Sequence, residues 1–421
     1  MKNDLLTEAK PSCVVVSGYY GFRNLGDEAV LLAMLDAFQK QWAQREKERP
    51  GAPSRALKVI VLSNDSGQTK ELYGVEAVNR WQLKEVYRVL RAADLFVSGG
   101  GSLLQDITGI KSLFYYLGVV WLALKLKKPV VFYAQGIGPV HTLTGQFLVR
   151  KIANQARLII VRDEQSAKDL ARMGIDRPPV HVTVDAALGL SCRDISAEAG
   201  QGILAHFGIF KADTGKKQRA EAKGQSENLP PGQRFSTSHP LPPSSKLAGI
   251  SVRNWPGFEK KGRLAVAKVA DRLAGQGWQV VFLPFHYPDD VAVCRDIAAL
   301  MKRPVPVLEK VCTVEEMVSI VKCLDLLIGM RLHALIFAAI LNVPLVGISY
   351  DPKIDRFLDQ LQFRPAARVN DLDLTNLNGA VEKVLRDLDG FRRDLAEKIK
   401  PLQELARQSA ILALDLLERS F

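Results

Sequence analysis

Cationic side chains stand directly after apolar, strand-like runs at several points of this 421-residue sequence. The segments are "VRDEQS" with Arg162, "ISVRNW" with Arg253 and Asn254, "FLPFHYPDD" with His286, and "LLIGMRLHALIF" with Arg331 and His333. A guanidinium group binds carboxylates and phosphates through paired hydrogen bonds. We therefore expect these residues to bind a small, highly charged anion. For Arg162 the alternative is a structural ion pair with Asp163 or Glu164.

The densest segment is "GMRLHALIFAAILNVPLVGISYDPKI", residues 329–354. Gly329, Arg331, Leu332 and His333 stand where a strand gives way to an apolar helix, and Lys353 follows the next strand. A lone histidine on an apolar helix is usually a core residue. A histidine two positions after an arginine at a helix start, where the helix dipole favours anions, instead indicates a binding site.

Three glycine-containing segments follow strand-like runs in the first half: "GYYGFRNLGDE", "SGGGSLLQD" and "AQGIGP". Their candidate residues are Gly26, Asp27, Glu28, Gly99, Gly100, Gly101 and Gln135. Glycines let backbone N–H groups approach a ligand, although each segment read alone also fits an ordinary turn. None matches the phosphate-binding G-x-x-x-x-G-K-[ST] motif or a dinucleotide fingerprint, so the patterns exclude NTPase and NAD-dependent classes.

Apolar strand-like runs alternate with helical patterns over most of the chain, which predicts an α/β fold with parallel sheets covered by helices on both faces. A polar segment at about 207–246 interrupts this pattern and is expected to be disordered. We predict an N-terminal Rossmann-like domain (1–192), a linker with this insert (193–246), a C-terminal Rossmann-like domain (247–388) and a helix (389–421) that packs back at the junction. Two doubly wound domains facing a cleft form a GT-B-like arrangement, with ligands at the carboxyl ends of the strands. The alternative is two independent domains without a shared site.

The formal net charge of +12 fits a merely basic surface, an anionic substrate or an anionic membrane face. Among these possible partners of a basic protein, a nucleic acid is the least favoured, because no recognised binding motif appears. Basic residues from Lys125 to Lys128 end an apolar helix, and Arg150, Lys151 and Arg157 follow it. The five cysteines lack metal-ligand spacing, the start of the chain lacks a signal peptide, and the apolar stretch 113–124 is too short to span a bilayer. We expect a cytoplasmic protein without a metal, with peripheral contact at the inner membrane face as an open alternative.

The sequence resembles the polysaccharide pyruvyl transferase family, in its branch that acts on bacterial cell-surface polymers. The motifs that carry this resemblance, in order, are "GYYGFRNLGDEAVL", "GGGSLLQD", "AQGIGP", "VRDEQS" and "GMRLHALIFAAILNVPLVGISYDPKI". The resemblance spans about 12–205 and 247–420, whereas the 207–246 segment is longer and more polar than the family needs. It implies a GT-B-like fold, phosphoenolpyruvate as co-substrate, and no further cofactor. It also implies a 4,6-linked pyruvate ketal on N-acetylmannosamine of a lipid-linked precursor, in cell-wall polysaccharide and S-layer biosynthesis.

The resemblance also suggests roles for individual residues. His333 would be the general base and Lys353 a proton source, while Arg162 and Arg331 would bind the carboxylate and phosphate of the donor. The remaining donor-binding candidates are Leu332, Arg253, Asn254, His286 and Gly329. Asp27 and Glu28, together with the glycine segments, would line the acceptor side or cap the following helix.

Two other functional classes remain open on the sequence alone. A GT-B glycosyltransferase with a nucleotide-sugar donor would need an acidic residue for the ribose in the second half, and none stands out there. A non-catalytic sugar-binding protein would leave the group of cations unexplained.

Overall fold

The computed structural model describes residues 11–48, 55–107, 109–209, 246–303 and 305–418. Most of the expected disordered insert, residues 210–245, lies outside this part. The chain divides into two compact units. Unit 1 comprises Met1–Ser191 with Pro401–Phe421, and unit 2 comprises Cys192–Lys400.

Unit 1 contains a parallel sheet with the strand order β3-β2-β1-β4-β5-β6-β7. Its strands are β1 (Ser12–Ser17), β2 (Leu57–Ser63), β3 (Glu76–Asn79), β4 (Leu95–Ser98), β5 (Val130–Gln135), β6 (Leu158–Val161) and β7 (Val180–Val182). Its helices are α1 (Leu25–Lys47), α2 (Ser66–Tyr73), α3 (Leu83–Ala92), α4 (Ile110–Lys125), α5 (Leu143–Ala153), α6 (Glu164–Arg172) and the 3-10 turn η1 (Ala186–Gly189). The strand order doubles back at β1, as in a Rossmann-like fold.

The strands of unit 1 are apolar on both faces because helices cover both. On one face, Cys13 and Val15 of β1 belong to a core that also contains apolar residues of α3, α4, α5 and α6. Val14 and Val16, which alternate with them, are also fully buried. Near-continuous apolar strands of this kind are typical of parallel sheets.

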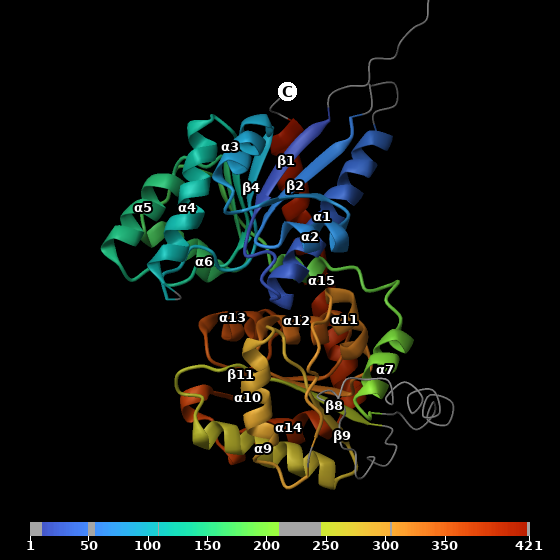
Figure 1. The fold of residues 1–421 in the computed structure, drawn as a ribbon. Helices are drawn as coiled ribbons and strands as arrows, with labels where there is room; N and C mark the ends of the chain where they lie inside the picture. The colour runs from blue at the N-terminus through green and yellow to red at the C-terminus, as the bar shows by residue number, and fades with distance from the viewer. Residues whose placement is uncertain (1–10, 49–54, 108, 210–245, 304, 419–421) are drawn as a thin grey trace, which may run out of the picture. The chain divides into compact units, whose positions relative to one another are not determined.

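Unit 2 contains a second parallel sheet with the order β12-β11-β10-β8-β9 (Figure 1). Its strands are β8 (Leu247–Ser251), β9 (Gln279–Phe282), β10 (Leu326–Gly329), β11 (Leu345–Ser349) and β12 (Ala367–Arg368). Its helices are α7 (Ala197–His206), α9 (Lys260–Gly275), α10 (Asp289–Ala298), α11 (Val314–Lys322), α12 (Leu332–Ile340), α13 (Pro352–Gln360), the 3-10 turn η3 (Val369–Asp371) and α14 (Leu374–Leu385). The α/β class with two Rossmann-like units, predicted from the alternating pattern, is confirmed.

The unit boundaries differ from the expected linker and C-terminal helix. Residues 197–206, expected within the linker, form α7, which packs on α11 in unit 2. Gly200 allows this contact, because a Cβ there would lie 2.2 Å from the Ser319 carbonyl oxygen. The last helix, α15 (Leu388–Glu418), belongs to unit 2 up to Lys400 and to unit 1 from Pro401 onward. In unit 1 its residue Asp415 pairs with Arg45 at 2.5 Å.

The loop between β1 and α1 is held by the first turn of the helix that follows it. Asn24 caps α1 by accepting the Gly26 N–H at 3.1 Å. Glu28 reaches back and accepts the Gly21 N–H at 2.8 Å, and its second oxygen accepts the Tyr73 hydroxyl at 2.8 Å. Burial raises the pKa of Glu28 from 4.5 to about 7, although both hydrogen bonds act in the opposite direction.

The raised pKa of Glu28 predicts a pH-dependent stability of unit 1. Because the folded state holds the proton more tightly than the unfolded chain, the contribution of Glu28 is complete below about pH 4.5. It is lost as the pH rises through about 7, at a cost on the order of 3 kcal/mol. Glu28→Gln carries no charge and should lose less stability between pH 5 and pH 8 than the wild type.

Thermal unfolding at several pH values measures this difference. Glu71→Gln, on the exposed side of α2, is the matched control and should follow the wild-type profile. Parallel profiles for Glu28→Gln and the wild type would show that Glu28 is ionised in the folded state at no cost.

Candidate active site

Four loops at the carboxyl edge of the unit 2 sheet bring most of the predicted cationic residues together. They follow β8, β9, β10 and β11. The first three carry Arg253, His286 and Arg331, and the fourth leads to Lys353 in the first turn of α13. Three of these residues, with Asn254 and Asp290, line an open pocket of about 750 Å³: Arg253, His286 and Arg331. Parallel strands share a carboxyl edge, which is why residues far apart in the sequence meet here.

Arg331 is not a free anion-binding group. Its guanidinium forms a two-pronged ion pair with Asp290, with Nε to Oδ2 at 2.9 Å and Nη2 bonded to Oδ1. Asp290 is 1% exposed and also accepts the N–H groups of Phe285 and His286, at 3.1 and 2.9 Å. This pair therefore fixes the loop after β9 against the start of α12. The expected binding of an anion by Arg331 stays a prediction, and in this structure its guanidinium is paired with Asp290.

Arg253 and Lys353 both lie against Tyr350, which directly follows β11. Arg253 Nη1 donates to the Tyr350 hydroxyl at 3.0 Å, and its guanidinium lies 4.8 Å from the centre of the Trp255 ring. Lys353 Nζ lies 5.3 Å from the centre of the Tyr350 ring. Within the described part of the chain, neither Arg253 nor Lys353 forms an ion pair with a carboxylate.

The pKa of Tyr350 is lowered by this positive charge. Burial acts to raise the pKa of its phenol, but Lys353, Arg253 and Arg331 together outweigh burial, and the pKa lies below its usual value. A site that favours a phenolate also favours other anions. The Nε of Arg253 is buried without a hydrogen-bond partner among the described residues, so the guanidinium keeps unused donor capacity.

The other predicted residues of unit 2 differ in what they offer. His333 is half-buried at the second position of α12, two residues after the pocket residue Arg331, which is the N-cap of that helix. His286 Nδ1 lies 3.2 Å from Asp289 Oδ2. Leu332 has a buried side chain, and a Cβ at Gly329 would lie 3.0 Å from Leu335. Both residues therefore contribute to the packing of α12 on β10. Toward a ligand, this segment could offer only the unsatisfied backbone N–H groups of the first turn of α12, as hydrogen-bond donors.

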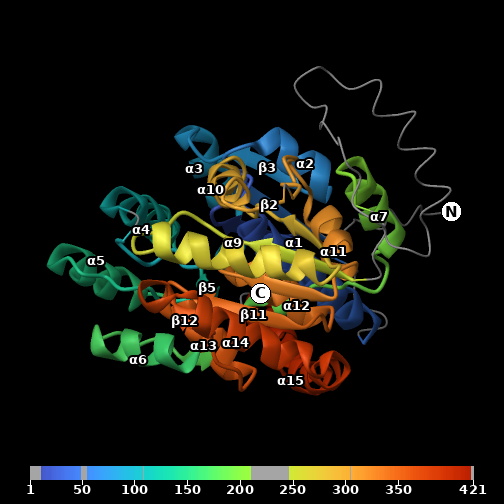
Figure 2. The same cartoon turned by 90° about the horizontal axis from the view of Figure 1, so that it is seen from below.

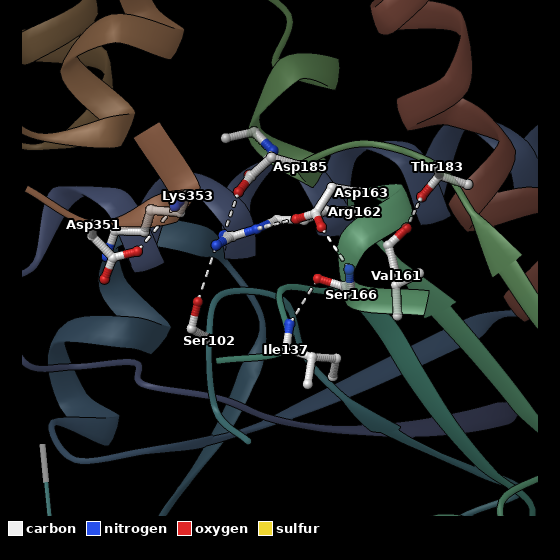
Figure 3. Close-up of polar contacts among 11 residues, drawn as sticks. Ser102, Ile137, Val161, Arg162, Asp163, Ser166, Thr183, Asp185, Asp351 and Lys353 are labelled. Carbon is white, nitrogen blue, oxygen red and sulfur yellow. Dashed lines mark hydrogen bonds and ion pairs between the residues drawn. The ribbon is translucent and has the colours of Figure 1, made fainter. Parts of the chain in front are cut away.

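In unit 1, Arg162 follows β6 and is held by neighbours of its own unit (Figure 3). Its Nη1 donates to Asp185 Oδ2 at 3.0 Å, and its Nη2 donates to Ser102 Oγ at 3.0 Å. Asp163 lies farther away, at 3.9 Å, and caps α6 instead. The arginine is 6% exposed, and a Cβ at Gly136 would come within 2.4 Å of it. Arg162 is therefore held by an ion pair, but its main partner is Asp185 and not Asp163 or Glu164 as the structural alternative had it.

Gln135 ends β5 at an irregular point of the sheet. The register shifts between Phe132 and Gln135, and Ala134 has a φ of +46°, which non-glycine residues rarely adopt. The shift aims Gln135 Nε2 at Ser98 Oγ and at the Gly99 carbonyl, both at 2.8 Å. Its Oε1 is fully buried and has no hydrogen-bond partner among the described residues. Such atoms are rare unless water or a ligand satisfies them.

The glycines of unit 1 make room for a side chain of the protein itself. A Cβ at Gly99 would lie 2.1 Å from the hydroxyl of Tyr20, which is fully buried. Gly101 has a φ of +90°, and a Cβ there would lie 2.9 Å from Asp27 Oδ1. At Gly99 the absence of a side chain thus makes room for Tyr20, while the expected approach of these glycines to a ligand stays a prediction. Gly100 is packed against Val30 in the same way.

Several residues of these two edges were not found from the sequence. Arg80 follows β3, is 3% exposed, and donates to the Gly18 carbonyl at 3.0 Å while its guanidinium lies 4.0 Å from the centre of the Tyr115 ring. It shares the strand-end position of Arg162 and Arg253, so the same pattern could have identified it. Tyr350 also directly follows a strand, β11, but its role and that of Asp185 depend on partners distant in sequence.

The structure thus groups the predicted residues by unit. Arg253, Asn254, His286 and Arg331 meet in unit 2. Arg162, Gln135, the glycine segments, Asp27 and Glu28 lie in the loops of the unit 1 sheet. The cleft expected between the units stays a prediction, because each unit is described by itself. Among the described residues, no group of three or more His, Cys, Asp or Glu side chains is arranged to hold a metal ion.

Solved structures similar to this chain share its fold at low sequence identity. The S. aureus MnaA–UDP complex matches with a TM-score of 0.57 and 12% identity, over 94% of each chain. The UDP-GlcNAc 2-epimerase from Neisseria meningitidis bound to UDP-GlcNAc matches with a TM-score of 0.56 and 13% identity, over 97% of this chain and 100% of that one. A putative UDP-N-acetylglucosamine 2-epimerase from Listeria monocytogenes matches with a TM-score of 0.58 and 11% identity, over 96% of each. These likenesses establish a GT-B fold.

A family model gives the more specific result. The model described as polysaccharide pyruvyl transferase matches residues 24–352, which is most of the chain. The matched range contains two of the glycine segments of unit 1, "SGGGSLLQD" and "AQGIGP", the end of the first one from Asn24, and the loops after β8, β9 and β10 in unit 2. The chain is therefore an enzyme of the transferase class, and it belongs to the polysaccharide pyruvyl transferase family.

Proposed function

We propose that this pyruvyl transferase takes pyruvate from phosphoenolpyruvate and forms a 4,6-ketal on an N-acetylmannosamine of a lipid-linked cell-wall precursor. The observation that carries the donor assignment is the positive cluster of Arg253 and Lys353 around Tyr350, beside the pocket of unit 2. Phosphoenolpyruvate carries about three negative charges, and close cationic groups of this kind favour such an anion. Peripheral contact with the anionic inner face of the membrane is part of the proposal, because the acceptor is attached to a lipid.

The reaction needs one proton on carbon and two new C–O bonds. A proton adds to the methylene carbon of the donor, which makes C2 electrophilic, and one sugar hydroxyl adds to C2. The bond from C2 to the phosphate oxygen then breaks, and the second hydroxyl closes the ring. One of the two hydroxyl protons balances the new methyl group and the other leaves with phosphate. No redox partner is needed.

The contacts of the described residues refine the roles implied by the family resemblance. Arg331 and Arg162 are each engaged by a buried aspartate, so we assign the grip on the donor carboxylate and phosphate to Arg253 and Lys353. His333 remains the general base, because its helix starts beside the pocket. On the acceptor side, the buried Oε1 of Gln135 is suited to accept a hydrogen bond from a sugar hydroxyl.

A nucleotide-sugar donor is the alternative, as in a GT-B glycosyltransferase. Thermal unfolding in the presence of phosphoenolpyruvate or of UDP-sugars separates the two, because a ligand that binds the native state raises its melting temperature. The proposal expects a rise with phosphoenolpyruvate and none with UDP-sugars. The reverse result would favour the alternative.

Replacing Arg253 by Ala should weaken phosphoenolpyruvate binding. The variant loses a guanidinium that no carboxylate neutralises within the described residues, so we expect an affinity loss of about 30- to 150-fold, on the order of 2–3 kcal/mol. Arg295→Ala is a matched control, because Arg295 lines the same pocket but already pairs with Glu309. Isothermal calorimetry measures both. Equal affinities for the two variants would remove Arg253 from the donor site.

Replacing His333 by Ala should lower turnover by roughly 10²- to 10⁴-fold, the usual contribution of general acid–base catalysis. The affinity for phosphoenolpyruvate should change much less, because other residues neutralise its charge. His333→Gln tests whether the ring only donates or accepts a hydrogen bond. If the Gln variant turns over within a few-fold of the wild type, His333 is not the base, and His286 with its neighbour Asp289 becomes the candidate.

A further inference from the structure

Three neighbouring helices of unit 1 each expose apolar or aromatic residues that are followed by a basic one. On α3, Leu83 and Tyr87 are 69% and 45% exposed, and the exposed Arg91 follows at the same four-residue interval. Residues four apart share a helix face, so the three lie in one line. An exposed tyrosine or leucine alone needs no explanation, but a repeated arrangement does.

The same arrangement recurs on α5 and α4. On α5, Leu143 and Phe147 are 83% and 60% exposed, and Lys151 Nζ lies 5.7 Å from the centre of the Phe147 ring. On α4, Phe114 and Trp121 are 41% and 49% exposed, and Lys125 Nζ lies 5.6 Å from the centre of the Trp121 ring. In each case the basic residue ends the line.

The three helices adjoin one another within unit 1. Helix α4 packs against α3 on one side and α5 on the other. Helices α4 and α5 lie side by side in the view of Figure 1 and again in the perpendicular view of Figure 2. The exposed residues of these helices therefore belong to one region of unit 1, which we call the α3–α5 surface. It comprises Leu83, Tyr87, Phe114, Trp121, Leu143 and Phe147.

The charge of the three helices that carry the α3–α5 surface is one-sided. The three helices contain seven Lys or Arg residues and one acidic residue, Glu85, which is paired with Arg88. This net charge of six is half of the chain's formal net charge of +12. Among the described residues, no helix is both long and apolar enough to cross a bilayer.

We propose that the α3–α5 surface docks onto an anionic lipid bilayer. Aromatic and leucine side chains enter the interfacial layer of a membrane, while lysine and arginine bind its anionic headgroups. Lys125 lies over the Trp121 ring, and Lys151 lies over the Phe147 ring. In each pair an aromatic ring and an ammonium group would therefore reach the interfacial layer at the same place. The inference deepens the proposed function, in which the acceptor is lipid-linked, by assigning the membrane contact to particular residues.

Sedimentation with vesicles tests this assignment on the full chain. We expect binding to vesicles of phosphatidylcholine mixed with phosphatidylglycerol, weakening with salt, and little binding to phosphatidylcholine alone. Leu143→Ser combined with Phe147→Ser should reduce binding at least about tenfold, and so should Lys125→Gln combined with Lys151→Gln. Because all four side chains are at the surface of unit 1, the melting temperature should stay close to that of the wild type.

Matched changes in unit 2 provide the controls. Leu300→Ser removes an exposed leucine, and Lys302→Gln with Arg303→Gln removes exposed charges, so both variants should bind vesicles as the wild type does. Unchanged binding of the α3–α5 variants, equal binding to neutral vesicles, or no binding by the wild type would each overturn the inference. The same variants should keep their turnover of a lipid-free acceptor. If neither the wild type nor any variant turned over the acceptor while the wild type still bound vesicles, the result would count against the proposed function and not against the membrane contact.

Discussion

The central constraint in this protein is an excess of positive charge at the carboxyl edge of the unit 2 sheet. Parallel pairing of β8, β10 and β11 brings the ends of these strands together, and each end carries a cation or leads to one. Asp290 neutralises Arg331, but within the described residues no carboxylate pairs with Arg253 or Lys353. Positive charge that no carboxylate neutralises favours a bound anion. The lowered pKa of Tyr350 and the proposed donor both follow from this charge.

The paired arginines have a different role from the free ones. Arg331 with Asp290, and Arg162 with Asp185, each tie a strand-end loop to another loop of the same unit. A buried pair of this type adds little net stability against an apolar replacement, but removing one partner leaves an uncompensated charge. We therefore regard both pairs as supports that hold the loops in place. The groups that contact the substrate would then be neighbouring side chains that still have an atom without a hydrogen-bond partner among the described residues, such as Nε of Arg253 and Oε1 of Gln135.

Much of this could be predicted from the sequence, because strand and helix periodicity is local. The two Rossmann-like units and the strand-end positions of Arg162, Arg253 and Arg331 follow from apolar runs and their ends. The partners do not follow, since Asp185 lies 23 residues from Arg162 and Asp290 lies 41 residues from Arg331. The glycines of the first half were correctly located, but the neighbour of Gly99 is Tyr20, whose hydroxyl comes from the loop after β1 and fills the space beside the loop after β4. Helix α7 was missed because its contact with α11 depends on Gly200 rather than on an apolar stripe.

The central claim is that the positive cluster of unit 2 serves the transfer of pyruvate and not of a nucleotide-linked sugar. Carbon NMR of the product, with phosphoenolpyruvate labelled at C2 and a lipid-linked amino-sugar acceptor, tests it most directly. The account predicts that the labelled carbon becomes a ketal carbon bonded to two sugar oxygens, with one phosphate released per ketal. Phosphoenolpyruvate that stays intact while a UDP-sugar is consumed and UDP is released would contradict it.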